Sequence, residues 1–244
     1  MADTRQSNPL IIPLDVATIG SARALADELR GLVGAFKVGK QLFTSEGPPA
    51  VTELVARGDR VFLDLKFHDI PNTVAAAVAS ATRLGVWMVD LHASGGTAMM
   101  RAARSAADEV AARLSRPAPL LIGVTVLTSL SDAGLHEVGV PGSAADQVVR
   151  LAVLAREAGL DGVVASPQEI GLIRRSCGDE FLIVTPVIRS TGDGKDDQQR
   201  TATAGEALRA GADYLVVGRP ITRAADPRAA AERFEAECRR TQHV

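Results

Sequence analysis

Residues 61–73 read VFLDLKFHDIPNT, a short apolar run that gives way to charged residues and then to a proline. The run has the length and composition of a buried strand, and the following proline is typical of the first turn of a helix. Side chains alternate between the two faces of a strand, so Asp64, Lys66 and His68 are expected on one face and the leucines and Phe67 on the other. The stretch therefore predicts a strand–loop–helix unit with a charged end.

The charges in this unit suggest a reaction centre. Asp64 and Asp69 flank Lys66, and two carboxylates around an ammonium suit a reaction that holds a cationic proton donor beside a developing negative charge. The alternative is a solvated surface ion pair, which would contribute little to stability. We favour the reaction centre for two reasons. The residues between the charges are apolar types that are usually buried, and a signal for the start of a helix follows directly.

Composition narrows the range of functions. The chain has 244 residues, enough for one large domain, and a net charge of −2 with 23% charged residues. Such a balance lacks the electrostatic footprint of a protein that binds nucleic acid or an anionic membrane. Aromatic residues make up only 3%, which also disfavours stacking platforms for single strands.

The chain is expected to be cytoplasmic and to form one domain. The polar residues 1–8 predict a short flexible leader without a signal core, and residues 9–244 the catalytic domain. The apolar runs are strand-sized, so no transmembrane helix is expected. Cys177 and Cys238 lie far apart without metal or redox spacing, and we interpret both as reduced thiols.

Eight apolar runs alternate with segments of helical periodicity. This order predicts a single-domain α/β fold, the (β/α)₈ or TIM barrel. The main alternative, a doubly wound open sheet, lacks the expected G-x-G-x-x-G after its first strand. The expected strands are 9–16, 35–40, 60–67, 88–93, 120–127, 162–166, 181–188 and 214–218.

Helix boundaries follow from capping residues. Ser21 is a plausible N-cap for the first helix, and Gly34 is expected to end it. Asn72 or Thr73 could cap the alanine-rich helix 74–84 that follows the charged stretch.

Unusual polar residues occur where the expected strands end. In a (β/α)₈ barrel, the functional residues gather at this edge. Spacing alone brings Asp64 and Lys66 together, and the barrel adds Lys37 from the neighbouring strand. The polar residues at strand ends are Asp15, Lys37, Lys40, Asp64, Lys66, Asp69, His92, Thr128, Ser166, Arg189, Gly218 and Arg219.

The ends of strands seven and eight predict a phosphate site. Arg189 and Arg219 follow these strands, and Gly218 allows close approach of the backbone. Either arginine alone would fit an ordinary surface role, but the pair favours binding. The polar loop 190–199 is either a solvated connection or a lid over the phosphate.

Several stretches together resemble the orotidine 5′-phosphate decarboxylase family, in the order in which that family carries them. Val187 departs from the glycine expected in most bacterial members. The matching stretches are FKVGKQLFTSEGP at 36–48, VFLDLKFHDIPNT at 61–73, LHASGG at 91–96, VTVLTS at 124–129, TPVIR at 185–189, DDQQR at 196–200 and VGRPIT at 217–222.

The resemblance implies conversion of orotidine 5′-phosphate (OMP) to UMP and CO₂ in de novo pyrimidine synthesis, without metal or other cofactor. It implies that Lys66 stabilises and protonates the C6 carbanion. Lys37 and Asp64 would act from the same subunit, and Asp69 from the partner subunit of a homodimer. The implied substrate contacts are Asp15 to the ribose, Thr128 to the pyrimidine edge, Gln198 from the lid, and Lys37, Asp64, Thr73, Arg189, Gly218 and Arg219.

Two alternative functions remain open. A hexulose-phosphate synthase shares the D-x-K-x-x-D core but performs magnesium-dependent aldol chemistry, with an acidic residue where this chain has Lys37. A catalytically silent barrel that binds nucleotide phosphates would need only the two arginines. His68 and His92 lack companions at metal-ligand spacing, so structural roles are expected for both.

Overall fold

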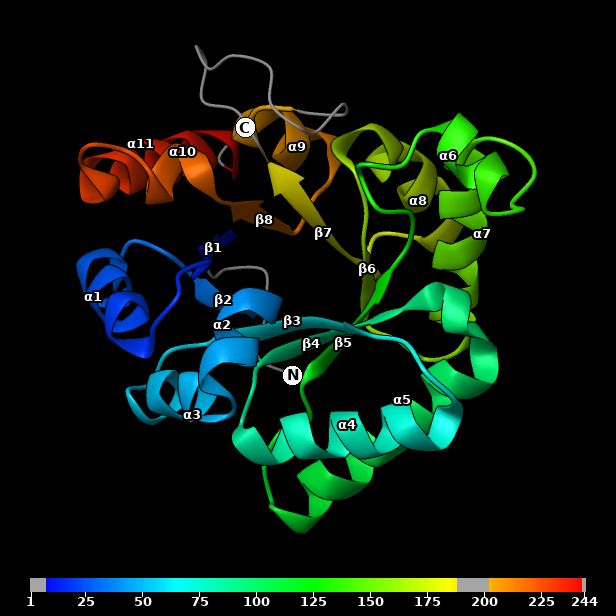
Figure 1. Cartoon of the computed structure of the whole chain (residues 1–244). Helices are drawn as coiled ribbons and strands as arrows, with labels where there is room; N and C mark the ends of the chain where they lie inside the picture. Colours follow the sequence, from blue (N-terminus) through cyan, green and yellow to red (C-terminus); the bar gives the residue numbers. More distant parts are fainter. Residues whose placement is uncertain (1–7, 188–201, 243–244) are drawn as a thin grey trace.

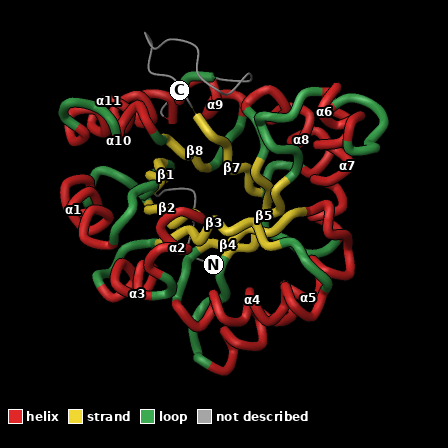
Figure 2. Tube along the Cα trace, viewed as in Figure 1, coloured by secondary structure: helices red, strands yellow, loops and turns green. Residues whose placement is uncertain are grey.

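The computed structural model describes residues 8–187 and 202–242 and confirms the barrel predicted from the sequence. Eight parallel strands close in the order β1 to β8, and Figure 2 shows them in the middle of the molecule with the helices around them. The strands are β1 (Leu10–Pro13), β2 (Ala35–Gly39), β3 (Val61–Phe67), β4 (Met88–His92), β5 (Leu120–Val124), β6 (Gly162–Val164), β7 (Leu182–Val187) and β8 (Tyr214–Val217).

Helices follow every strand within the described residues, as Figure 1 shows. They are α1 (Ile19–Leu29), α2 (Lys40–Glu46), α3 (Pro49–Ala56), α4 (Pro71–Leu84), α5 (Gly96–Arg113), α6 (Asp132–Glu137), α7 (Ala144–Glu157), α8 (Ile170–Cys177), α9 (Ala204–Ala210), α10 (Arg219–Thr222) and α11 (Pro227–Gln242). Two 3₁₀ turns, η2 (Ala93–Gly95) and η3 (Pro167–Glu169), precede α5 and α8.

The strands are apolar on both faces because both faces are buried. Outward residues pack against the helices in one large cluster, which includes Leu63 and the partly buried Leu65 and Phe67. Inward residues fill the barrel in a second cluster, which includes Phe62 and Met88. The charged side chains of Lys37, Asp64 and Asp90 take inward positions nearer the strand ends, above this apolar cluster.

The predictions are wrong for both ends of α1 and for the start of α4. Thr18 caps α1 in place of Ser21, whose backbone N–H donates to the Thr18 side chain, and α1 ends at Leu29 with Arg30 as its C-cap, before Gly34. Gly34 serves close packing, because a Cβ there would lie 1.9 Å from the carbonyl oxygen of Asn8.

The second correction concerns α4, which begins at Pro71 and not after Thr73. Proline at the first helical position lacks the N–H that would otherwise be unsatisfied, so neither Asn72 nor Thr73 is needed as a cap. Gly85 ends this helix in the left-handed conformation. The proline brings the helix start to within a few residues of Lys66.

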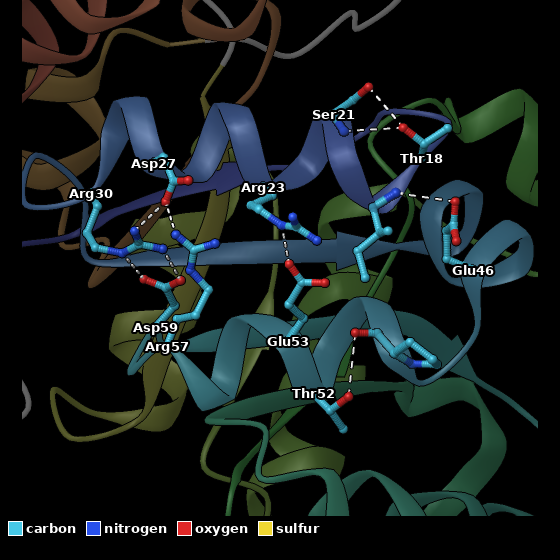
Figure 3. A network of polar contacts seen from close by, with 12 residues as sticks. Thr18, Ser21, Arg23, Asp27, Arg30, Glu46, Thr52, Glu53, Arg57 and Asp59 are labelled. Atoms are coloured by element: carbon cyan, nitrogen blue, oxygen red, sulfur yellow. Dashed lines mark hydrogen bonds and ion pairs between the residues drawn. The ribbon is translucent and has the colours of Figure 1, made fainter.

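A polar network ties α1 to α3 and to the turn before β3 (Figure 3). Arg30 donates to both oxygens of Asp59 at 2.8 and 2.7 Å, and Asp27 accepts from both Arg30 and Arg57. Each exposed pair adds little stability by itself, but the Asp59 side chain is nearly buried. The network thus fixes the entry of the chain into the strand that carries the central charges.

The first described residue is already anchored to the barrel. Asn8 donates from Nδ2 to the Leu32 carbonyl at 2.7 Å, and its Oδ1 accepts from Leu10 N at 3.0 Å.

Across residues 8–187 and 202–242, no helix is long and apolar enough to cross a membrane.

Candidate active site

The central charges come from inward positions of three neighbouring strands. Each of these strands places an apolar side chain inward deep in the barrel and a charged one inward nearer its end. The inward pairs are Ala35 and Lys37 on β2, Phe62 and Asp64 on β3, and Met88 and Asp90 on β4. Strand order places the three charged side chains next to one another.

Asp64 joins two lysines through its two carboxylate oxygens. Lys37 Nζ lies 2.9 Å from Asp64 Oδ2, and Lys66 Nζ contacts Asp64 Oδ1. Asp90 Oδ2 lies 3.5 Å from Lys66 Nζ, and Asp15 Oδ1 lies 3.7 Å from Lys37 Nζ. The structure therefore brings together Lys37, Asp64 and Lys66, as predicted, and adds Asp15 to them, whereas the predicted fourth member, Asp69, is not among these contacts.

The backbone around Lys66 departs from a regular strand. Leu63 pairs with Val89 and Phe67 pairs with Leu91, so three residues of β3 face Asp90 alone. Lys66 has a φ of 54°, which is unusual for a residue with a side chain and costs on the order of 1 kcal/mol or more. Such bulges redirect side chains and are common beside active sites.

Contacts between Asp64, Lys66 and their neighbours shift the pKa values of both groups toward the charged forms. Burial raises the pKa of Asp64, but the charge of Lys37 and hydrogen bonds from Asp90 and Lys66 outweigh it and hold the pKa far below its usual range. Burial likewise opposes the charged form of Lys66, but Asp90 and Asp64 raise its net pKa above the usual value. Lys66 is therefore an ammonium at neutral pH, beside an ionised Asp64.

A cavity of about 510 Å³ opens above these charges, a size suited to a small ligand. Asp15 and Thr128 line it, as do Gly218 and Arg219 at the end of β8. The charged cluster and the arginine thus belong to one cavity. A ligand in it would meet ammonium and carboxylate groups at one part of its surface and a guanidinium at another.

Two predicted site residues lie outside the cavity of their own chain. Asp69 and Thr73 are exposed around the start of α4, next to Ile70, whose side chain is 66% exposed. The Asp69 carboxylate accepts from the Ile70 N–H at 2.6 Å. His68 is also exposed and does not line the cavity, although alternation would have put it beside Lys66.

Other predictions fall outside the described residues. Arg189, Gln198 and the predicted lid 190–199 lie there, as does the side chain of Val187. Their roles stay predictions.

Sequence reasoning missed three residues of the site. Asp90 is fully buried, and its signal was a lone acid between two apolar residues at an inward position. Gly39 has no side chain where a Cβ would lie 3.2 Å from both Lys37 Nζ and Asp15 Oδ1. Arg223 lines the cavity one helical turn after Arg219, a spacing that could have indicated a second cation at that end.

The two histidines near the site contact each other. The ring centroids of His68 and His92 lie 5.3 Å apart. Burial lowers the pKa of His92 from 6.5 to about 4, and the nearby positive charges add to this effect, from His68, Lys66 and Lys40. No group of three or more potential metal-binding side chains occurs among residues 8–187 and 202–242.

The lowered pKa of His92 predicts a pH-dependent loss of stability. Between pH 6.5 and about 4 the unfolded chain binds a proton at His92 that the folded chain does not. The free energy of unfolding therefore falls as the pH drops through this window, by a few tenths to about 1 kcal/mol because the ring is only half-buried.

Denaturant unfolding of wild type and His92→Asn at several pH values measures this contribution. The variant should lose less stability on acidification than wild type. The control is His136→Asn, because His136 is exposed and far along the chain. Equal acid slopes for wild type and His92→Asn would contradict the assignment.

The chain is similar to known proteins over nearly its whole length. The model of the orotidine 5′-phosphate decarboxylase / HUMPS family matches residues 8–234. Orotidine 5′-phosphate decarboxylase from Moorella thermoacetica is 56% identical over 229 residues, which cover 93% of this chain and 91% of the relative. The enzyme of that name from Alkalilimnicola ehrlichii is 57% identical over 228 residues, covering 93% and 95%.

A solved structure extends the likeness to three dimensions. The crystal structure of orotidine 5′-phosphate decarboxylase from Lactobacillus acidophilus superposes with a TM-score of 0.85 at 36% identity, covering 95% of this chain and 99% of that one. Since the family model spans nearly the whole chain and the relatives share more than half of their residues with it, this chain belongs to the orotidine 5′-phosphate decarboxylase / HUMPS family.

Proposed function

We propose that this protein decarboxylates orotidine 5′-phosphate to UMP and CO₂ in de novo pyrimidine synthesis, in the cytoplasm and without a cofactor. The observation that carries the proposal is the Asp64 carboxylate shared by Lys37 and Lys66 in the wall of the cavity. The relatives named for this reaction, at 56% and 57% identity, support the choice of substrate.

Lys66 is the proton donor of the proposed reaction. Loss of CO₂ from C6 of the pyrimidine leaves an electron pair on that carbon. The Lys66 ammonium stabilises this charge and then transfers a proton to C6, which gives UMP and a neutral amine. The amine regains its proton from solvent. Asp64 keeps Lys66 charged and aimed by direct contact, and Lys37 holds Asp64 in place through the other carboxylate oxygen.

The remaining cavity residues hold the substrate. Asp15 would contact the ribose hydroxyls and Thr128 the edge of the pyrimidine, because both line the cavity near the charged cluster. Arg219 and the backbone at Gly218 would bind the phosphate. We assign Arg189 and Gln198, with the lid 190–199, to the same phosphate.

The main alternative is a magnesium-dependent aldolase similar to hexulose-phosphate synthase, and the printed family name covers both groups. Lys37 disfavours it, because its ammonium lies 2.9 Å from Asp64 where a divalent cation would be repelled. A silent phosphate-binding barrel would need neither Lys66 nor its contact with Asp64. Formation of UMP from OMP in the presence of EDTA distinguishes all three functions.

We also propose a homodimer in which Asp69 completes the partner's site. Asp69 is exposed and lies outside its own cavity, and the adjacent Ile70 exposes 66% of its surface. The interface we propose would cover Ile70 together with Asp69. Thr73 lies exposed on the same segment and would enter the partner's site with Asp69.

Replacement of Lys66 should abolish most of the activity. Lys66→Ala removes the proton donor and is expected to lower kcat for OMP by at least 10²–10⁴-fold, the usual contribution of general acid catalysis. Lys66→Arg should not restore it, because a broad guanidinium does not replace a compact proton-donating ammonium. Near-wild-type turnover by purified Lys66→Ala, measured as UMP formed, would disprove the mechanism.

Mixing two inactive variants tests the shared site. Lys66→Ala and Asp69→Ala proteins, once their subunits exchange, form mixed dimers with one doubly damaged and one intact site. Random exchange should restore about a quarter of wild-type activity.

The control mixture is Lys66→Ala with Asp64→Ala. Both residues act within one chain, so every site in this mixture stays damaged and no activity should return. Absence of recovery in the first mixture, with exchange verified by a tagged subunit, would mean that Asp69 acts within its own chain.

Arg219 should contribute only when the substrate carries a phosphate. Arg219→Ala is expected to lower kcat/KM for OMP by about 2–4 kcal/mol of transition-state stabilisation. The loss should nearly vanish with orotidine, which lacks the phosphate. Arg228→Ala is the control, because Arg228 pairs with Glu232 on the surface of α11. An equal loss on both substrates would exclude a phosphate anchor at Arg219.

A further inference from the structure

Asp90 is a buried carboxyl group that the proposed mechanism does not use. It lies on β4, is 0% exposed, and lines the wall of the cavity beside Lys66. Aspartate is rarely buried to this degree without a specific partner. Its partners should therefore explain its presence.

The main partner of Asp90 is the backbone of Lys66. Asp90 Oδ1 accepts a hydrogen bond from the Lys66 N–H at 2.8 Å. This N–H belongs to the bulge of β3, where residues 64–66 face Asp90 alone. A backbone N–H inside a barrel needs an acceptor, and here the acceptor is a side chain in place of a strand carbonyl.

The same peptide carries the unusual conformation of the bulge. Lys66 has a φ of 54°, and among the described non-glycine residues only Ser115 shares a positive φ. A conformation of this kind persists only where surrounding contacts hold it. The hydrogen bond to Asp90 holds the Lys66 N–H, and any rotation of this peptide out of the left-handed conformation would have to break that bond.

The other oxygen of Asp90 makes a weaker contact. Asp90 Oδ2 lies 3.5 Å from Lys66 Nζ, and Asp90 also shares a hydrogen bond with the Asp64 carboxylate. Burial and the nearby charge of Asp64 raise the pKa of Asp90 well above its usual value, which favours the neutral acid. Oδ1 accepts the Lys66 N–H whether or not the carboxyl group is ionised, so this contact does not require a negative charge.

We propose that Asp90 is a positioning residue. By accepting the Lys66 N–H, it holds the Lys66 backbone in the left-handed conformation from which the ammonium reaches Asp64. The inference rests on the proposed function for its kinetic consequence, but the hydrogen bond itself is testable without any turnover.

Two substitutions separate the acceptor from the charge. Asp90→Asn keeps the shape and an Oδ1 acceptor but cannot ionise, whereas Asp90→Ala has no acceptor. Asp90→Ala should lower kcat for OMP by roughly a hundred-fold, the cost of a misplaced catalytic group, with little change in KM. Asp90→Asn should keep most of the wild-type kcat.

Amide hydrogen exchange at Lys66 provides a readout independent of activity. The Lys66 amide should be protected in wild type and in Asp90→Asn, and should exchange much faster in Asp90→Ala. Asp90→Leu, which fills the space without an acceptor, should behave as Asp90→Ala and serves if the smaller side chain prevents folding.

Asp161→Ala is the matched control. Asp161 also accepts a backbone N–H from a neighbouring strand, that of Leu121 at 2.7 Å, but it does not line the cavity. Its loss should reduce stability without lowering kcat, which separates positioning from a general effect on the barrel.

The outcomes decide the proposal in each case. Unchanged protection of the Lys66 amide in Asp90→Ala and Asp90→Leu would overturn it, as would wild-type kcat in these variants. A kcat of Asp90→Asn as low as that of Asp90→Ala would also overturn it, because the acceptor alone would then be insufficient. If wild type failed to convert OMP, the proposed function would fall, and hydrogen exchange would still decide the role of Asp90.

Discussion

A side chain that points into a closed eight-stranded barrel remains inside it, and this constraint governs the rest of the molecule. Alternation along a strand sends every second residue inward. Deep in the barrel these positions are filled by residues such as Phe62 and Met88, which pack as a core. Two residues further along, the same rule delivers Asp64 and Asp90 to the cavity wall. The strands that form the barrel therefore also direct the charged side chains into the cavity.

The charged cluster persists because its members compensate one another. An isolated ammonium in the wall of the barrel would lose its hydration, and no ion pair or hydrogen bond would compensate for that loss. Lys37 and Lys66 instead share Asp64, one on each carboxylate oxygen. Burial of such a set is weak evidence for stability, since well-packed apolar residues would often serve as well. Its presence at the ends of the strands that line the cavity is better explained by the proposed reaction than by folding.

Much of the fold could be predicted from the sequence because strand-sized apolar runs and helical periodicity are local signals. All eight expected strands occur, and Asp64 and Lys66 meet as their spacing implied. The bulge at Lys66 could not be foreseen, because it depends on the register between β3 and β4, which is a non-local property. His68 was misplaced for the same reason, since simple alternation assumes a regular strand. The role proposed for Asp69 involves a second chain, so the geometry of one chain does not test it.

Carboxylates that accept strand N–H groups occur three times in the described barrel, and the comparison clarifies Asp90. Asp161 accepts from Leu121 N and pairs with Arg104, and Asp213 accepts from Ile183 N and pairs with Arg174. Asp161 directly precedes β6 and bonds to β5, and Asp213 directly precedes β8 and bonds to β7; the charge of each carboxylate is balanced by its arginine. These two contacts are structural, because they join the starts of neighbouring strands.

Asp90 uses the same contact at the opposite end of the barrel, where the peptide that it holds belongs to Lys66. No arginine pairs with it among the described ion pairs, and its near cation is the Lys66 ammonium itself. A guanidinium at this point would remain permanently charged and would add a further cation beside Lys66, the proposed proton donor. A buried acid with a raised pKa can align the backbone without that addition. The contact between a carboxylate and a backbone N–H, which aligns strands elsewhere, would here align the side chain of Lys66. It would do so without adding a charge to the cluster of Asp64 and its two lysines.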